Sequence, residues 1–175
     1  MRKVLCFFSV LVASLFALSS VNAVSISLAD ETVNQVGEYD STRFVAGNNV
    51  TNKASVDGLS FIAGNELNLS GSAPYGFYAG NIIVINENIE KDMFVAGNNI
   101  TIGTDAIVGR DAYIAGNMIT INTDITRDLR VGGTRVDLSG ITVGGDAFIG
   151  AEEIIMDENT VIHGKLSYPE SSTIT

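Results

Sequence analysis

Five nearly identical seven-residue fragments recur along this chain. They read RFVAGNN, SFIAGNE, GFYAGNI, MFVAGNN and AYIAGNM and begin at residues 43, 60, 76, 93 and 112. Two degenerate copies, LRVGGTR and AFIGAEE, extend the series. The residues that mark equivalent positions are Gly47, Gly64, Gly80, Gly97, Gly116, Gly133 and Ala151. An interval of 16 to 19 residues is too short for a pair of helices and is typical of a solenoid whose coils hold three short strands each.

Apolar residues alternate along each copy, as they do in strands with one buried face. The residues expected to point inward before the marker are Val45, Ile62, Val95, Ile114, Val131 and Ile149. After the marker, a second strand carries the apolar pairs Leu67 and Leu69, Ile83 and Ile85, Ile100 and Ile102, Ile119 and Ile121, Val136 and Leu138, and Ile154 and Met156. A shorter third strand carries Val108, Ile125, Val143 and Ile162. We therefore predict an all-β fold, a single-stranded parallel β-helix (β-solenoid) of about seven coils. We expect it to be right-handed, because the drifting intervals break a strict hexapeptide frame.

The predicted organisation has four parts. Residues 1–23 form a signal peptide, 24–40 an N-terminal cap or linker, 41–167 the β-solenoid and 168–175 a C-terminal tail. Residues 24–28 alternate like a strand and are expected to cap the first coil or to add to it. Pro169 is expected to end the pairing at the other end, because proline lacks the N–H that a ladder needs.

The first residues predict export. A cationic start at Arg2 and Lys3 precedes an apolar run over residues 4–18 and a small-residue cleavage site that ends at Ala23. The run is short for a membrane anchor, although an uncleaved anchor stays an alternative. The only cysteine, Cys6, leaves with the signal.

The formal net charge of −10 disfavours nucleic acid and anionic membranes as partners. We expect a bacterial protein of the cell envelope or the extracellular space, with no stable transmembrane span after cleavage.

Alternation also predicts which side chains face outward. If the aliphatic residues point inward, the aromatic residues beside them form an exposed aromatic stripe with one ring per coil, about 4.8 Å apart. The stripe consists of Phe44, Phe61, Phe77, Phe94, Tyr113 and Phe148. Arg130 in the same column favours the outward orientation, because burying an arginine in so narrow a coil is costly. The opposite assignment, with rings inside and aliphatics outside, stays open. Exposed, the stripe is expected to contact a partner or another copy.

Two further columns follow from the repeat. The marker glycines are expected at corners where φ is positive. An asparagine ladder follows them, in which stacked amides are expected to hydrogen-bond along the rod; its members are Asn48, Asn65, Asn81, Asn98 and Asn117. A column of aspartates precedes the first strand and consists of Asp92, Asp111, Asp128 and Asp146. Lys91, Arg110 and Arg127 stand next to three of them, so a charged corner with salt bridges is favoured over a cation site.

Catalytic constellations are not evident in the sequence. His163 is the only histidine, the mature chain has no cysteine, and no cofactor or metal is expected. The stretch VGRDAYIAGN resembles the hexapeptide repeat of acyltransferases with left-handed β-helices, which is a minor alternative. Tight coils without long loops also leave no walls for a glycan-cleaving cleft. We expect that the protein is not an enzyme.

The coil pattern resembles the bactofilins, the polymer-forming bacterial cytoskeletal family, most clearly in DMFVAGNNITIGTDAIVGRD over residues 92–111. The resemblance implies a rigid β-helical rod that assembles end to end without nucleotide or metal and serves as a scaffold. The chain departs from that family in its signal peptide and in the short segment before the coils. Two functions therefore stay open. One is an exported scaffold that associates with itself, end to end or laterally. The other is a module that binds envelope polysaccharide or another envelope protein through the stripe.

Overall fold

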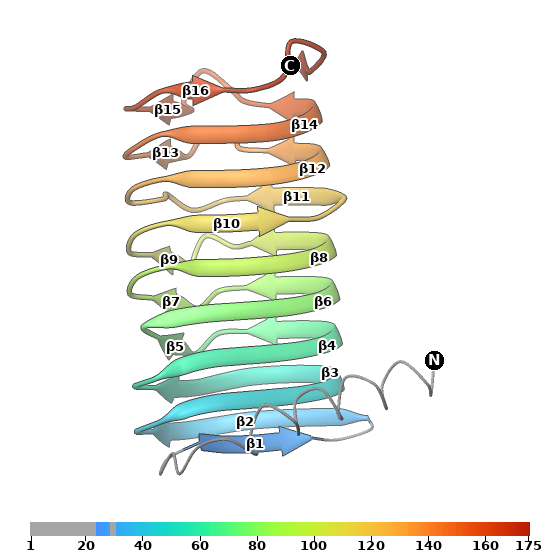
Figure 1. Cartoon of the computed structure of the whole chain (residues 1–175), viewed down its shortest axis with the longest axis vertical. Helices are drawn as coiled ribbons and strands as arrows, with labels where there is room; N and C mark the ends of the chain where they lie inside the picture. The colour runs from blue at the N-terminus through green and yellow to red at the C-terminus, as the bar shows by residue number, and fades with distance from the viewer. Residues whose placement is uncertain (1–23, 29–30) are drawn as a thin grey trace, which may run out of the picture.

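The computed structural model describes residues 24–28 and 31–175, so the predicted signal peptide lies outside the described residues. In the described part of the chain every regular element is a strand. The chain winds upward as a stack of coils with β1 at the lower end and the C-terminus at the upper end (Figure 1). Strands in front run to the right and those behind run back to the left as the chain rises, which makes the coil right-handed, as predicted.

Each coil contributes strands to three faces of the rod. The first face is built by β1 (Val24–Leu28), β3 (Thr42–Val56), β4 (Leu59–Leu69), β6 (Tyr75–Ile85), β8 (Met93–Ile102), β10 (Ala112–Ala115), β12 (Leu129–Asp137), β14 (Ala147–Ile155) and β16 (Leu166–Ser167). The second face holds β2 (Thr32–Tyr39), the later halves of the long strands, β11 (Met118–Ile121) and β17 (Thr173–Ile174). The third face holds β5 (Ser72–Ala73), β7 (Asn88–Ile89), β9 (Ile107–Val108), β13 (Thr142–Val143) and β15 (Val161–Ile162), with bridges at Ile125.

Equivalent residues of successive copies lie one above another, as the repeat predicts. All pairings are parallel, and the register joins Phe61 to Phe77 and Tyr113 to Arg130. Along the third face Val108 pairs with Ile125, which pairs in turn with Val143. The β-solenoid architecture predicted from sequence is therefore confirmed.

The rod is longer than the seven coils expected from sequence and has about eight. At the N-terminal end β1 and β2 both pair with β3 in parallel register, so this segment adds a coil. At the C-terminal end the expectation that Pro169 ends the pairing is wrong. The chain turns after Pro169, where the Ser172 N–H donates to its carbonyl, and β17 then pairs with β14. A proline at a turn costs no ladder bond, so pairing resumes beyond it.

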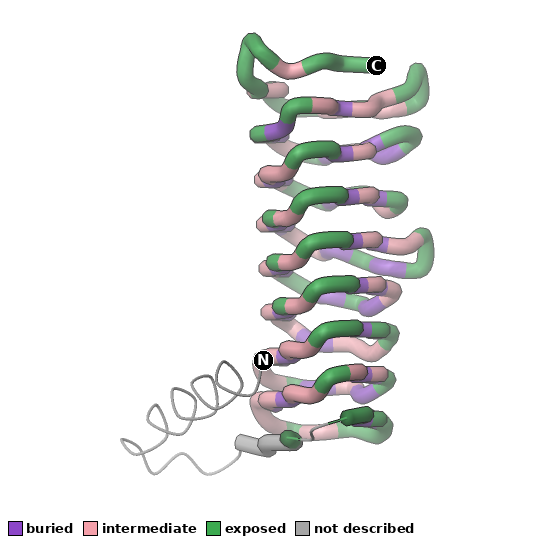
Figure 2. Tube along the Cα trace, turned by 90° about the vertical axis from the view of Figure 1, so that its right-hand side faces the viewer, coloured by how far each residue is buried: buried purple, intermediate pink, exposed green. Residues whose placement is uncertain are grey.

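Buried residues recur from coil to coil along the rod (Figure 2), and most of them are aliphatic. All six residues expected to point inward before the marker are buried, as are both members of each second-strand pair except Met156, which is partly buried. Tyr78 takes the place of an aliphatic residue in the first column and is itself buried. Because no coil buries its apolar face alone, stacking of the coils provides the stabilisation.

The marker glycines have a different cause from the one expected. Among the described glycines only Gly37 and Gly140 have positive φ, so the prediction of positive φ at the markers is wrong. The cause is crowding between coils at this corner. A Cβ on Gly97 would lie 2.8 Å from the carbonyl oxygen of Gly80, and one on Gly116 would lie 2.9 Å from that of Gly97. At these two positions glycine lets the backbones stack at the strand spacing, where an added Cβ would collide with a backbone oxygen of the preceding coil.

Candidate functional site

The aromatic stripe lies on the outer surface of the first face. Its rings are partly exposed, whereas the aliphatic neighbours of each ring are buried. Five of the six rings form one continuous stack from Phe44 to Tyr113. Successive centroids are separated by 4.5, 4.6, 4.8 and 4.7 Å, and interplanar angles do not exceed 15°. The strand spacing imposes this face-to-face geometry, since side chains at equivalent positions of parallel coils must repeat at that distance.

Arg130 interrupts the stack. Its guanidinium carbon lies 5.4 Å from the ring centroid of Tyr113 and 5.5 Å from that of Phe148, so it bridges the stack to the sixth ring. The guanidinium also lies 3.4 Å from a carboxylate oxygen of Asp128. A flat cation is the charged group best suited to fill a slot between two rings. The outward position of Arg130 was the sequence argument for an exposed stripe, and the structure places it there.

Stacking limits which surfaces of the stripe's rings a ligand can contact. The faces of the inner rings are covered by their neighbours, so solvent reaches mainly their edges. Phe148 differs, because its neighbour in the next coil is Ser167, which carries no ring. Phe148 is also the most exposed stripe member, at 42%. Of the described stripe residues it alone presents an unstacked ring face toward the C-terminal end.

A shallow groove of about 680 Å³ lies beside this ring face. It is lined by Arg130, Val131, Gly132, Phe148, Ile149, Gly150, Ser167, Tyr168 and Pro169. Gly132 and Gly150 form part of its floor, and a Cβ on either would meet no atom closer than 3.9 Å. These two glycines stand where the other coils carry alanine, and crowding does not require them. The groove therefore exists because the alanine column stops at the C-terminal end of the stripe.

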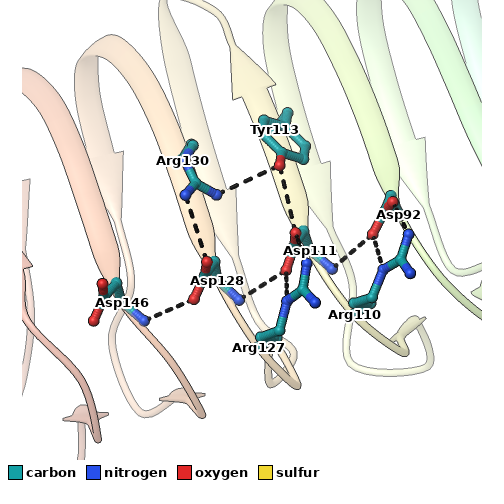
Figure 3. Close-up of polar contacts among 8 residues, drawn as sticks. All are labelled: Asp92, Arg110, Asp111, Tyr113, Arg127, Asp128, Arg130 and Asp146. Atoms are coloured by element: carbon teal, nitrogen blue, oxygen red, sulfur yellow. Dashed lines mark hydrogen bonds and ion pairs between the residues drawn. The ribbon is translucent and has the colours of Figure 1, made fainter.

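The aspartate column forms a hydrogen-bonded corner (Figure 3). The carboxylate of each aspartate accepts the backbone N–H of the equivalent residue in the next coil. These N···O distances are 3.3 Å from Asp111 to Asp92, 3.2 Å from Asp128 to Asp111, 3.0 Å from Asp146 to Asp128 and 2.8 Å from Lys165 to Asp146. The column thus satisfies backbone donors at a corner where strand pairing is interrupted.

Arginines neutralise two members of this column. Arg127 donates from Nε and Nη2 to the two carboxylate oxygens of Asp111, at 2.6 and 2.5 Å, and Arg110 binds Asp92 in the same forked way. The hydrogen bonds from Arg127 lower the pKa of the Asp111 carboxyl, and those from Arg110 lower the pKa of Asp92. The charged corner favoured from sequence is therefore what the structure shows. Lys91 differs from the expectation, because its Nζ lies 5.1 Å from the ring centroid of Tyr75 and forms no ion pair with the column.

The asparagine ladder is an exposed column without the expected side-chain bonds. All five asparagines are exposed at their corner. The contact between two members is a backbone one, in which the N–H of Asn117 donates to the carbonyl of Asn98 at 3.0 Å. Within residues 31–175 no side-chain amide hydrogen bond joins consecutive members, so the expectation of amide stacking is wrong. Asparagine faces water here, where its amide needs no protein partner.

Sequence reasoning missed a polar group in the interior. Glu87 is fully buried, and its carboxylate accepts hydrogen bonds from the Tyr78 hydroxyl at 2.5 Å and from Asn52 Nδ2 at 3.0 Å. We call Asn52, Tyr78 and Glu87 the interior polar cluster. Burial raises the pKa of Glu87 to about 7 and raises that of Tyr78 well above its ordinary value. The sequence does contain a signal of this cluster. Asn52, Tyr78 and Glu87 each differ in residue type from the equivalent positions of other coils, and the three differences fall in neighbouring coils.

A second polar contact lies below this cluster. The Arg43 guanidinium is buried, binds the side-chain oxygen of Gln35 and lies 3.5 Å from the ring centroid of Tyr39. An arginine is therefore buried inside this coil despite the expected cost of such burial. Its charge is accommodated by an amide oxygen and an aromatic face, which reduce the cost of burial.

The acidic residues and the histidine in the described part of the chain are not grouped for metal binding. No cluster of three or more histidine, cysteine, aspartate or glutamate side chains in this part of the chain could hold a metal ion. His163 is exposed on the third face near the C-terminal end. The described residues contain no helix with the length and apolar character needed to span a membrane.

Comparison of the chain with protein-family models, with curated proteins and with solved structures returns no match.

Proposed function

We propose that this protein is an exported, non-catalytic structural scaffold of the cell envelope that associates with copies of itself. The observation that carries the proposal is the continuous rod of about eight parallel coils. Its outer surface is braced by a stacked aromatic column and by a ladder of carboxylates and arginines. The likeness of residues 92–111 to the bactofilin coil pattern supports the same class of function. The signal peptide predicted over residues 1–23 supports export.

The two ends of the rod differ in what they offer for association. At the N-terminal end β2 is an eight-residue strand that pairs only with β3 among the described residues. At the C-terminal end β16 and β17 are two residues long each, and the Ser172 hydroxyl donates to the carbonyl of Ala151 at 2.6 Å. A long strand edge is a template for another strand, whereas short edges are poor ones. We expect association through the N-terminal edge.

Val36→Lys should weaken self-association of the chain formed by residues 24–175. Val36 is 66% exposed on β2, and a lysine on an edge strand opposes pairing with a second edge. Sedimentation velocity over a concentration series, with electron microscopy of the same samples, measures the effect. The matched control is Ile107→Lys, which places the same charge on an exposed position in the middle of the rod. Equal behaviour of the two variants, or a wild-type chain that stays monomeric at every concentration, contradicts association through this edge.

A second candidate function is a binding module for envelope polysaccharide. The observation in its favour is the unstacked face of Phe148 beside the groove, together with exposed Tyr168. Sugar rings bind proteins by laying an apolar face on an aromatic ring, and the inner rings of the stripe have no free face for this contact. Binding through the stripe is therefore confined to its C-terminal end in this proposal.

Phe148→Ser and Phe94→Ser should separate binding from stability. Phe94 has a ring stacked on each side, so its loss is expected to lower the free energy of unfolding by about 1–3 kcal/mol while the buried core keeps the fold. Phe148→Ser should cost less than Phe94→Ser and should remove any binding of cell-wall oligosaccharides measured by calorimetry. If wild type binds no oligosaccharide, the binding module is excluded. If Phe94→Ser unfolds the protein, the stripe is part of the core.

A further inference from the structure

The interior polar cluster spans three consecutive coils, with residues from the first and the third. Asn52 comes from β3, Tyr78 from β6, and Glu87 from the segment between β6 and β7. Asn52 and Glu87 are two coils apart, and their side chains meet across the coil between them at 3.0 Å. All three residues are buried, at 3% exposure or less. The cluster therefore connects backbone segments that no strand pairing connects directly.

Two glycines make room for these contacts. A Cβ on Gly71, in the intervening coil, would lie 3.0 Å from Asn52 Nδ2 and 2.0 Å from the carbonyl oxygen of Ala54. A Cβ on Gly76 would lie 2.5 Å from the hydroxyl oxygen of Tyr78. The polar side chains thus fill space that aliphatic residues fill in the later coils. The cluster therefore depends on several residues that fit together, three polar side chains and two glycines, and not on a single polar substitution.

Burial, and not a neighbouring charge, decides which protonation state of Glu87 is favoured. Tyr78 on β6 is the titratable group that faces Glu87, and Asn52 on β3 is the uncharged polar neighbour of Glu87. Ser60 on β4 hydrogen-bonds to Tyr78 and not to Glu87. Gly71 and Ala106 lie in the coils that flank Glu87. The other charged side chain buried in these coils is Arg43, which contacts Gln35 and the ring of Tyr39. A carboxylate in such a position has two hydrogen-bond donors but remains removed from water.

We propose that the interior polar cluster is a pH-responsive switch that holds the three coils from β3 to β7 tightly stacked when Glu87 is protonated and loosens them when Glu87 ionises. Buried ions are costly even when hydrogen-bonded. The two bonds that Tyr78 and Asn52 donate favour the ionised carboxylate of Glu87, but the cost of its removal from water is larger. The switch lies inside the N-terminal half of the rod and shares no residue with the stripe, the groove or the edge of β2. It therefore stands independently of the proposed function.

The direction of the effect follows from linkage. The pKa of Glu87 is about 7 in the folded protein and 4.5 as its ordinary value. Between these values the folded state holds a proton that the unfolded state has released, so the folded state is favoured at the lower pH. The stabilising contribution is complete below about pH 4.5 and is lost as the pH rises through 7. Opening of these coils is expected to become up to tenfold easier per pH unit within this window.

Hydrogen exchange measured by mass spectrometry tests the switch in the chain formed by residues 24–175, at a concentration where it is monomeric. After correction for the intrinsic pH dependence of exchange, amides of residues 50–90 should lose protection between pH 5 and 8 in wild type. Glu87→Gln keeps an acceptor for Tyr78 but does not titrate, so its protection should stay constant. Amides of residues 112–156 serve as the internal control and should not change in either protein.

A direct titration keeps the proposal falsifiable if Glu87→Gln fails to fold. Carbon-13 NMR of the side-chain carboxyls in wild type should show one glutamate that titrates near pH 7. Tyr78→Phe removes a hydrogen bond that lowers this pKa, and it should move the midpoint upward. A midpoint near 4.5 for Glu87, or equal loss of protection in wild type and Glu87→Gln, overturns the switch.

Discussion

Gly109→Ala is expected to destabilise the rod by about 3 kcal/mol or more. A Cβ at this position would lie 2.0 Å from the carbonyl oxygen and 2.7 Å from the carbonyl carbon of Glu90, both of which are backbone atoms in the preceding coil. Neither atom moves unless the coils separate. Because Gly109 N–H also donates to the Ile89 carbonyl at 2.8 Å, separating the coils breaks strand hydrogen bonds as well. Thermal unfolding should show a decrease in Tm of about 6–12 °C.

Gly150→Ala is the matched control for this experiment. The same methyl group would meet nothing closer than the Val131 carbonyl oxygen at 4.0 Å, and Gly150 does not have positive φ. The substitution should be neutral or should stabilise the fold by up to about 1 kcal/mol, because it restricts the unfolded chain. If the two alanine variants unfold at the same temperature, crowding between coils is not what requires glycine at position 109.

Asp111→Ala should lower the free energy of unfolding by about 2–3 kcal/mol. Its carboxylate is almost fully buried and binds both Arg127 and the backbone N–H of Asp128, at 2.6 and 3.2 Å. Alanine leaves the N–H without an acceptor at the corner, and a buried donor left unpaired costs about 1–3 kcal/mol. Loss of the forked arginine contact adds to this cost. Urea unfolding followed by circular dichroism measures the change, with an unaltered slope indicating that both chains unfold to the same extent.

The comparison for Asp111 is Asp146→Ala. Within the described part of the chain the Asp146 carboxylate accepts only the Lys165 N–H, at 2.8 Å, because Gly164 stands where earlier coils carry the pairing arginine. Its loss should cost less than half as much. The two variants should also differ with pH. The lowered pKa of Asp111 stabilises the folded state above about pH 3.8, and this stabilisation is lost as the pH falls through the lower folded value. Identical acid unfolding of Asp111→Ala and wild type would contradict this role for the ion pair.

Residue columns allowed most of the fold to be predicted from sequence. An interval of 16 to 19 residues and a period-two pattern assign both the stacking direction and the buried face, and Val45, Ile114 and Ile149 lie inside as expected. The stripe and the acidic corner follow from the same stacking, because equivalent side chains must repeat at the strand spacing. What each surface binds does not follow, since stacking determines where a side chain lies and not what it meets outside the molecule.

The polar interior escaped prediction for a different physical reason. A period-two pattern assigns Tyr78 and Glu87 to a face but does not show that their polar atoms meet, because the partner Asn52 lies two coils away. Similarly, the glycines at the markers look like turn residues in the sequence, whereas the structure shows that they are sites of close approach. Contacts along the axis depend on side-chain reach, which a linear pattern does not encode.

Nearest-neighbour stacking has a consequence for how such a chain changes length. Each inner coil touches the one below and the one above, and the registers on both sides are equivalent. Removing residues 93–111 would place Tyr113 over Phe77 and Ile114 over Tyr78, which preserves the type of almost every contact. Duplication or deletion of a whole coil should therefore cost little stability, and rods of different length can arise in this way from one ancestral gene.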